Sequence, residues 1–149
     1  MALIDLVVEK IVKIPLESTV KPDVIRELVK ILKDAEEISD YNEALKAVQD
    51  REDKQSTGLT EGIAVPHAKT SAVKSLKLAI GVSPEGIDFD SMDNQPSRLF
   101  FLLLAAPGMS GPHVEALAEI ARLSRSRALC KALVNADDAH EVVELLTVI

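Results

Sequence analysis

Three side chains of this 149-residue sequence are suited to phosphoryl chemistry, namely His67, His113 and Arg51. His67 follows Gly-Ile-Ala-Val-Pro, so Pro66 restricts the backbone immediately before the imidazole. His113 follows Gly-Pro at the expected start of a helix, where backbone N–H groups and the macrodipole favour an anion. Arg51 offers a planar guanidinium that matches phosphate geometry. Taken singly, each is also typical of an ordinary position: a turn histidine, an exposed first-turn residue and a solvated helix end.

The combination supplies the parts for reversible phosphorylation of a histidine. A neutral imidazole, which an ordinary pKa near 6.5 provides at neutral pH, attacks phosphorus directly and needs no general base. Positive charge and N–H donors then stabilise the equatorial oxygens of the phosphoryl group. This predicts a site with His67 as the nucleophile and with Arg51 and His113 beside it, without a protein-bound metal or a cofactor.

The other reactive side chains point to structural roles. His140 lies among acidic residues, which is typical of a solvated helix face. Cys130 has apolar neighbours at helical spacing and is expected in the core rather than as a nucleophile. Residue 144 is Glu where a zincin helix needs its second histidine, and two histidines without an obvious third ligand disfavour a catalytic zinc site. The glycine-rich phosphate-binding motifs and the G-x-S-x-G nucleophile motif are absent.

The hydrophobic pattern predicts the elements that must position these residues. Apolar side chains at helical spacing, with proline and polar start signals, indicate amphipathic helices. Short apolar runs bounded by turn residues indicate strands, and the longest of them is expected to be buried on both faces. The pattern therefore predicts a mixed α/β domain with helices at both ends and a central sheet. The predicted helices are 22–35, 40–50, one from His113, 128–134 and one opened by Asp137-Asp138; the predicted strands are 62–65 (with Pro66-His67 as its exit), 76–82 and 98–106, with a turn-rich excursion over 84–97 that holds a hairpin around Ile87-Asp88-Phe89.

Composition limits the classes of function. The length predicts one domain, residues 1–149. A net charge of −7 argues against a nucleic-acid partner, and 3% aromatic residues leave little for stacking on bases or sugars. One cysteine excludes an internal disulfide, no apolar run is long enough to span a bilayer, and the N-terminus is a poor secretion signal. The expected location is therefore the cytoplasm, without insertion into the membrane.

Residues 56–68, which read Ser-Thr-Gly-Leu-Thr-Glu-Gly-Ile-Ala-Val-Pro-His-Ala, resemble the signature of a known family. They are similar to the fructose/mannitol-type (type 2) EIIA domains of the bacterial phosphoenolpyruvate-dependent phosphotransferase system, which include the nitrogen-regulatory EIIA proteins. The specific core A-[LIVM]-P-H-[GAC] runs here from Ala64 to Ala68, and the resemblance extends over nearly the whole chain. Thr60 departs from the usual Gly or Ala, and its β-carbon would restrict a positive φ at that position.

The resemblance implies a fold, roles and partners. The family fold is a mixed sheet of about five strands flanked by helices. By resemblance, His67 accepts a phosphoryl group on Nε2 from phospho-HPr or its nitrogen-branch homologue, and His113 and Arg51 are the second active-site histidine and the active-site arginine. The chain would pass the group to an EIIB cysteine or hold it as a signal. It would thus be a transferase component that acts as a carrier rather than as a stand-alone turnover enzyme.

Alternative functions stay open at this point. Because no EIIB or membrane EIIC segment follows in this sequence, a free-standing nitrogen-regulatory EIIA is favoured over a separate EIIA component of a fructose- or mannitol-type sugar permease. A binding module that has the fold but is never phosphorylated predicts that His67→Ala leaves partner binding unchanged. A metal-dependent hydrolase that uses His67 and His113 predicts stoichiometric zinc in the purified protein.

Overall fold

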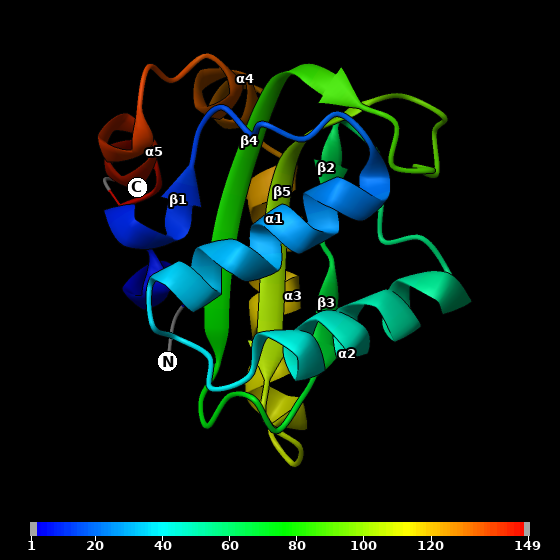
Figure 1. Cartoon of the computed structure of the whole chain (residues 1–149). Helices are drawn as coiled ribbons and strands as arrows, with labels where there is room; N and C mark the ends of the chain where they lie inside the picture. Colours follow the sequence, from blue (N-terminus) through cyan, green and yellow to red (C-terminus); the bar gives the residue numbers. More distant parts are fainter. Residues whose placement is uncertain (1–2, 148–149) are drawn as a thin grey trace.

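One mixed sheet of five strands organises residues 3–147, the part of the chain that the computed structural model describes. The two long strands are antiparallel neighbours at its centre, and each of the three short strands pairs in parallel with one of them. Helices flank this sheet, so the predicted mixed α/β class is confirmed (Figure 1). The predicted domain, 1–149, also includes residues 1–2 and 148–149, which lie outside the described range. The strands are β1 (Val12–Lys13), β2 (Ile63–Ala64), β3 (His67–Lys69), β4 (Lys77–Ile87) and β5 (Ser97–Ala105).

Strand β5 pairs with three of the other four strands of the sheet. Eight of its nine residues are buried, the exception being Arg98, as expected for a strand covered on both faces. It pairs with β4 on one side and with both β2 and β3 on the other. His67 opens β3 opposite Leu103, so the prediction that Pro66-His67 is only the exit of a strand is wrong. Pro66 lacks an N–H, but its carbonyl oxygen accepts Leu103 N–H at 3.0 Å, which lets the pairing with β5 continue past the proline.

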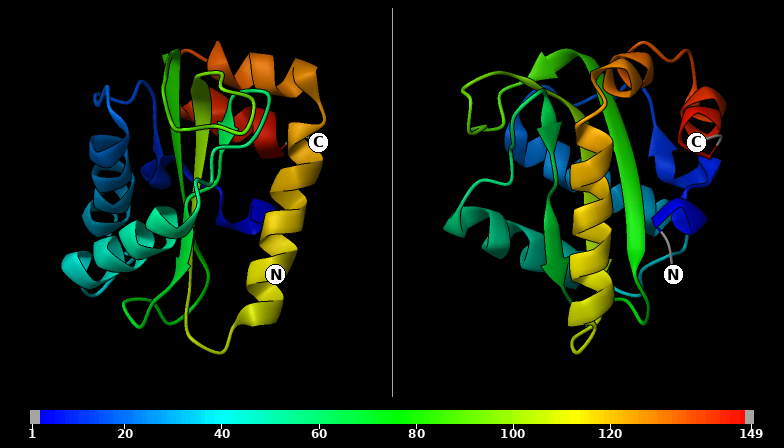
Figure 2. Two further views of the ribbon diagram at one scale, coloured as in Figure 1. Left: turned by 90° about the vertical axis from the view of Figure 1, so that its right-hand side faces the viewer. Right: turned by 180° about the vertical axis from the view of Figure 1, so that it is seen from behind.

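The helices form one layer on each face of the sheet. The helices Lys21–Asp34 and Tyr41–Lys54 cover one face, and the helices Ser110–Ser124, Arg127–Val134 and Ala139–Thr147 lie against the opposite face (Figure 2). The apolar stripe predicted for the first helix is buried at Ile25, Leu28, Val29 and Leu32, which confirms that helix. The helices are α1 (Lys21–Asp34), α2 (Tyr41–Lys54), α3 (Ser110–Ser124), α4 (Arg127–Val134) and α5 (Ala139–Thr147), and the 3₁₀ helices η1 (Leu3–Leu6) and η2 (Glu9–Ile11), which were not predicted, precede β1.

Two helix boundaries differ from prediction in ways that concern the site. Helix α2 is capped by the Asp40 carboxylate, which accepts Glu43 N–H at 3.0 Å, but it continues a full turn beyond the predicted end near residue 50. The charged residues of that turn are solvated on its outer side, whereas Glu52 is buried on its inner side. Helix α3 begins at Ser110 rather than at His113, which places His113 inside its first turn.

The ends of the last two helices agree with the start signals in the sequence. Ser126 caps α4 by accepting Leu129 N–H at 3.2 Å, and an oxygen of Asp138 accepts Glu141 N–H at 2.9 Å at the start of α5. No helix within residues 3–147 is long and apolar enough to cross a bilayer.

The excursion over 84–97 departs from its prediction. Strand β4 runs to Ile87, which pairs with Ser97 after a register irregularity that begins at Val82, so there is no hairpin around residues 87–89. Phe89 is fully buried, and its ring meets the Phe100 ring edge-on with the centroids 5.3 Å apart. Burial of this large aromatic side chain outweighs the turn-forming composition around it.

Candidate functional site

The three residues predicted to form a site come together from three elements. Arg51 lies in the last turn of α2, His67 begins β3, and His113 lies in the first turn of α3. The rings of His67 and His113 meet edge-on, with centroids 5.3 Å apart and planes at 69°. Arg51 and His67 line one pocket of about 270 Å³, together with Met92 and Leu117. The pairing of β3 with β5 and the packing of α3 on β5 therefore unite residues that are far apart in the sequence.

The hydrogen bonding of His67 defines which nitrogen can act as a nucleophile. Its Nδ1 lies 2.8 Å from the carbonyl oxygen of Val65. A carbonyl oxygen only accepts, so Nδ1 carries the proton and the lone pair of the neutral ring is on Nε2. Burial lowers the pKa of His67 below its ordinary 6.5; the Val65 bond opposes this shift, Arg51 adds to it and Glu52 opposes it. At neutral pH the ring is therefore an uncharged base with Nε2 available.

His113 is a buried polar side chain with an unused nitrogen. Only 7% of the residue is exposed, so it is not the exposed first-turn residue that a lone helix-start histidine suggests. Its Nε2 has no hydrogen-bond partner among residues 3–147. Burial lowers the pKa of His113, and the neighbouring His67 and Lys69 lower it further. Because an unpartnered buried polar atom is costly, Nε2 is suited to a polar group that arrives beside His67.

Two cations border the site, and one of them was missed in the sequence. Arg51 is half-buried, and its Nη1 donates to the carbonyl oxygen of Gln55 at 2.8 Å. Lys69, two residues after His67 on β3, projects from the same side of the strand and donates to Ser110 Oγ at 2.6 Å. The i, i+2 spacing would have revealed Lys69 if residues 67–69 had been recognised as a strand.

The loop before His67 depends on glycine at one position. A β-carbon on Gly58 would lie 2.7 Å from Ser91 Oγ and 2.9 Å from Ser91 Cα. The left-handed backbone of the loop falls on Glu61 (φ 61°) and Gly62 (φ 78°) rather than on Thr60. The β-carbon of Thr60 therefore causes no strain, because the backbone has no positive φ at that residue.

Other reactive groups lie outside this site. His140 is exposed and lies against Glu9 and Glu144, which raise its pKa, as expected for a solvated helix face. Cys130 is half-buried, and burial followed by the charge of Glu61 raises the pKa of its thiol, which makes it a poor nucleophile. Within the described residues, no group of three or more His, Cys, Asp or Glu side chains is placed to hold a metal ion.

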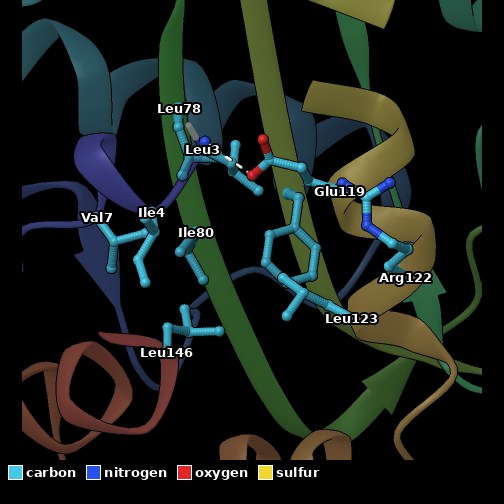
Figure 3. A pocket seen from close by; sticks show the side chains of 10 residues that line it. Leu3, Ile4, Val7, Leu78, Ile80, Glu119, Arg122, Leu123 and Leu146 are labelled. Atoms are coloured by element: carbon cyan, nitrogen blue, oxygen red, sulfur yellow. Dashed lines mark hydrogen bonds between the residues drawn. The ribbon is translucent and has the colours of Figure 1, made fainter. Parts of the chain in front are cut away.

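A second cavity, of about 340 Å³, lies beside α3, η1 and α5 (Figure 3). Its lining is mainly aliphatic, with Phe101 from β5 and with Glu119 and Arg122 from α3. A carboxylate oxygen of Glu119 accepts Leu3 N–H at 2.8 Å, which ties η1 to α3. Among the described residues, this lining contains no histidine, so the histidine chemistry predicted from the sequence belongs to the pocket that contains His67.

The fold is that of an EIIA-type domain of the phosphotransferase systems. The chain belongs to the family described as the phosphoenolpyruvate-dependent sugar phosphotransferase system, EIIA 2, whose model matches residues 6–148.

Relatives in this family carry two kinds of name. The chain is 34% identical over 126 residues to a fructose-specific EIIA component of Haloferax volcanii, covering 85% of this chain and 82% of the relative. It is 33% identical over 148 residues to a nitrogen regulatory protein of Bradyrhizobium diazoefficiens, covering 98% and 95%. It is also 34% identical over 146 residues to a fructose-specific EIIABC component of Bacillus subtilis; that match covers 98% of this chain but only 23% of the relative's length.

Solved structures share the fold of this chain. Nitrogen regulatory protein IIA-Ntr of Neisseria meningitidis superposes with a TM-score of 0.89 at 26% identity, covering 97% of this chain and 99% of that protein. Enzyme IIA for mannitol of Escherichia coli, in its complex with phosphorylated enzyme IIB, superposes with a TM-score of 0.80 at 22% identity over 94% and 96% of the two chains, which shows the shared fold.

Proposed function

We propose that this chain is a phosphoryl carrier in which His67 accepts a phosphoryl group from phospho-HPr or from its nitrogen-branch homologue. The observation that carries this proposal is the hydrogen bond from His67 Nδ1 to the Val65 carbonyl oxygen, at 2.8 Å. It leaves Nε2 with its lone pair in a pocket that also presents the Arg51 guanidinium. His113 Nε2, buried and unpartnered in the described chain, lies on the neighbouring ring.

The transfer step balances without a general base. The lone pair on His67 Nε2 forms a bond to phosphorus while the P–N bond of the donor histidine breaks, and the electron pair of that bond stays on the donor imidazole. His67 keeps its Nδ1 proton, and the Val65 carbonyl oxygen stabilises the positive charge that develops on the ring. Arg51 offsets the negative charge on the phosphoryl oxygens, and His113 Nε2 donates a hydrogen bond to one of them when it carries the proton.

The downstream partner defines two versions of this carrier. We favour a nitrogen-regulatory role, supported by 33% identity to a nitrogen regulatory protein along 95% of its length and by the TM-score of 0.89 to IIA-Ntr. The second candidate, an EIIA component that passes the group to an EIIB cysteine of a fructose- or mannitol-type permease, is supported by 34% identity to a fructose-specific EIIA component. Transfer from the phosphorylated chain to a purified sugar-specific EIIB domain would favour the permease role.

Intact-mass spectrometry at neutral to alkaline pH, where phosphohistidine survives, tests the carrier chemistry. The protein is incubated with phosphoenolpyruvate, enzyme I and HPr, or with phosphoenolpyruvate and the nitrogen-branch homologues of those two proteins. We expect a gain of one phosphoryl group, about 80 Da, that is absent in His67→Ala and kept in the matched control His140→Ala. No gain with either donor pair would refute the carrier and favour an unphosphorylated binding module.

A further inference from the structure

A continuous series of hydrogen bonds connects His67 to a buried carboxylate that lies outside its pocket. His67 Nδ1 donates to the carbonyl oxygen of Val65 at 2.8 Å, and Val65 N–H donates to the carbonyl oxygen of Thr57 at 3.1 Å. Thr57 in turn donates twice to Glu52, from its N–H to Oε2 at 2.7 Å and from Oγ1 to Oε1 at 2.6 Å. Glu52 is therefore the side chain at the end of this series, and it supports a backbone that the pairing of β2 and β3 with β5 also holds.

Glu52 is itself paired with a half-buried cation. Lys21 Nζ, at the start of α1, lies 3.0 Å from Glu52 Oε2, and the two side chains are 17% and 4% exposed. The same Nζ is 3.3 Å from the carbonyl oxygen of Phe89 and 4.6 Å from the centre of the Phe89 ring. Both carboxylate oxygens of Glu52 thus have partners, and the carboxylate cannot rotate without leaving buried donors unpaired.

Arg51 contacts the same segment, 55–57, that Glu52 binds. It is the residue before Glu52, and its guanidinium donates to the carbonyl oxygen of Gln55, so both side chains hold the segment 55–57 against the end of α2. Arg51 faces the pocket, whereas Glu52 faces the interior. Releasing Glu52 would therefore loosen the segment that carries both the arginine contact and the Thr57 link to Val65.

We propose that Glu52 is a positioning residue for His67, acting through Thr57 and Val65 to hold the imidazole with Nδ1 protonated and Nε2 facing the incoming phosphoryl group. The effect on transfer rate rests on the proposed carrier function, whereas the effect on the ring does not. Stability alone does not call for this pair, because well-packed apolar residues often replace a buried ion pair without loss. What such a replacement would remove here is the pair of acceptors that fixes Thr57.

Two readouts separate positioning from a merely structural role. The first is the tautomer of His67 in the full chain, read from its imidazole ¹⁵N shifts at pH 8, where the ring is neutral. The second is the initial rate of phosphoryl acceptance at a temperature where thermal unfolding shows each variant to be folded. The variants are the double replacement Lys21→Met with Glu52→Met, the near-isosteric Thr57→Val and the hydroxyl-retaining Thr57→Ser. Lys46→Met with Asp50→Met, which removes an exposed ion pair from α2, is the matched control for the lost ion pair.

We expect the double variant to lose the single Nδ1–H tautomer and to accept phosphoryl groups roughly tenfold more slowly, because misplacing a reacting group costs at least that much. Thr57→Val should show a smaller loss of the tautomer and of the rate. Thr57→Ser, which keeps the hydroxyl, should retain most of the tautomer and rate of the parent chain. If the double variant does not fold, the comparison of Thr57→Val with Thr57→Ser decides. Folded variants with the tautomer and rate of the parent chain would overturn the inference. A tautomer change in a chain that no donor phosphorylates would refute the carrier function and leave the positioning intact.

Discussion

The carboxyl of Glu27 on α1 makes an acid-sensitive contribution to stability that can be estimated from its contacts. It accepts the N–H groups of Glu17 and Ser18, both at 2.9 Å, and pairs with Lys13 Nζ at 2.8 Å. Burial would raise its pKa, but these bonds outweigh burial and lower the pKa of Glu27 from 4.5 to about 2. Replacing Glu27 by Gln removes the charge and one acceptor, and so releases the segment before α1.

The sign and size of the effect follow from the shift. A carboxyl with a lowered pKa in the folded state adds stability above its unfolded pKa of 4.5, and that stability is lost as the pH falls toward about 2. The full shift corresponds to about 3 kcal/mol, and we expect about 2 kcal/mol because the pair is partly screened by solvent.

Urea unfolding at pH 7 and at several values down to pH 3 measures the difference. Glu27→Gln should lose about 2 kcal/mol at pH 7 and progressively less as the pH falls below 4.5. Glu17→Gln is the matched control, because that side chain is 82% exposed and lies 3.7 Å from the same lysine; it should change stability by less than about 0.5 kcal/mol. A difference for Glu27→Gln that is the same at pH 7 and pH 3 would refute the charge-based explanation.

Three further outcomes are expected. Arg51→Ala should slow phosphoryl acceptance by roughly 10²–10³-fold in quench-flow measurements while far-UV circular dichroism stays unchanged, because one preorganised charge is lost; equal rates would make Arg51 a surface charge. The acceptance rate should be flat from pH 8 to pH 7 and fall only below the ordinary imidazole pKa of 6.5, because burial lowers the pKa of His67 and keeps its neutral form in excess; a rate that already declines below pH 7.5 would contradict this. Gly58→Ala should cost about 1–3 kcal/mol in thermal unfolding because its β-carbon meets Ser91, whereas Gly111→Ala, which has nothing within 4 Å, should cost less than about 0.5 kcal/mol; equal effects would argue against the clash.

Elements governed by local rules were predictable from the sequence. The stripe from Ile25 to Leu32 specifies the buried face of α1, and Asp40 and Ser126 cap α2 and α4 as their residue types suggest. The apolar run of β5 is buried as expected. These features depend on side chains within a few positions of one another, so the sequence carries their full signal.

Features that depend on distant partners were missed or misplaced. Strand β3 is three residues long and follows a proline, so it has no periodicity of its own and exists because Leu103 and its neighbours in β5 offer it a partner. The extra turn of α2 is stabilised because Glu52 forms an ion pair with Lys21 and accepts a hydrogen bond from Thr57 N–H. Phe89 belongs to a turn-like sequence but is buried in the core, because its ring packs against the Phe100 ring and against the Lys21 ammonium group.

The candidate site also combines features that the sequence indicated with features that depend on distant partners. The types and local spacing of Arg51, His67 and His113 already indicated what chemistry they could perform, because an imidazole can act as a nucleophile and a guanidinium can bind phosphate through their own covalent structure. Only the tertiary structure decided that the two rings lie 5.3 Å apart, that His113 is buried with its Nε2 unpartnered in the described chain, and that His67 is protonated on Nδ1. Those properties arise from the pairing of β3 with β5, which fixes the backbone at Pro66 and His67, and from the packing of α3 on β5. Such contacts form only when distant segments pack together.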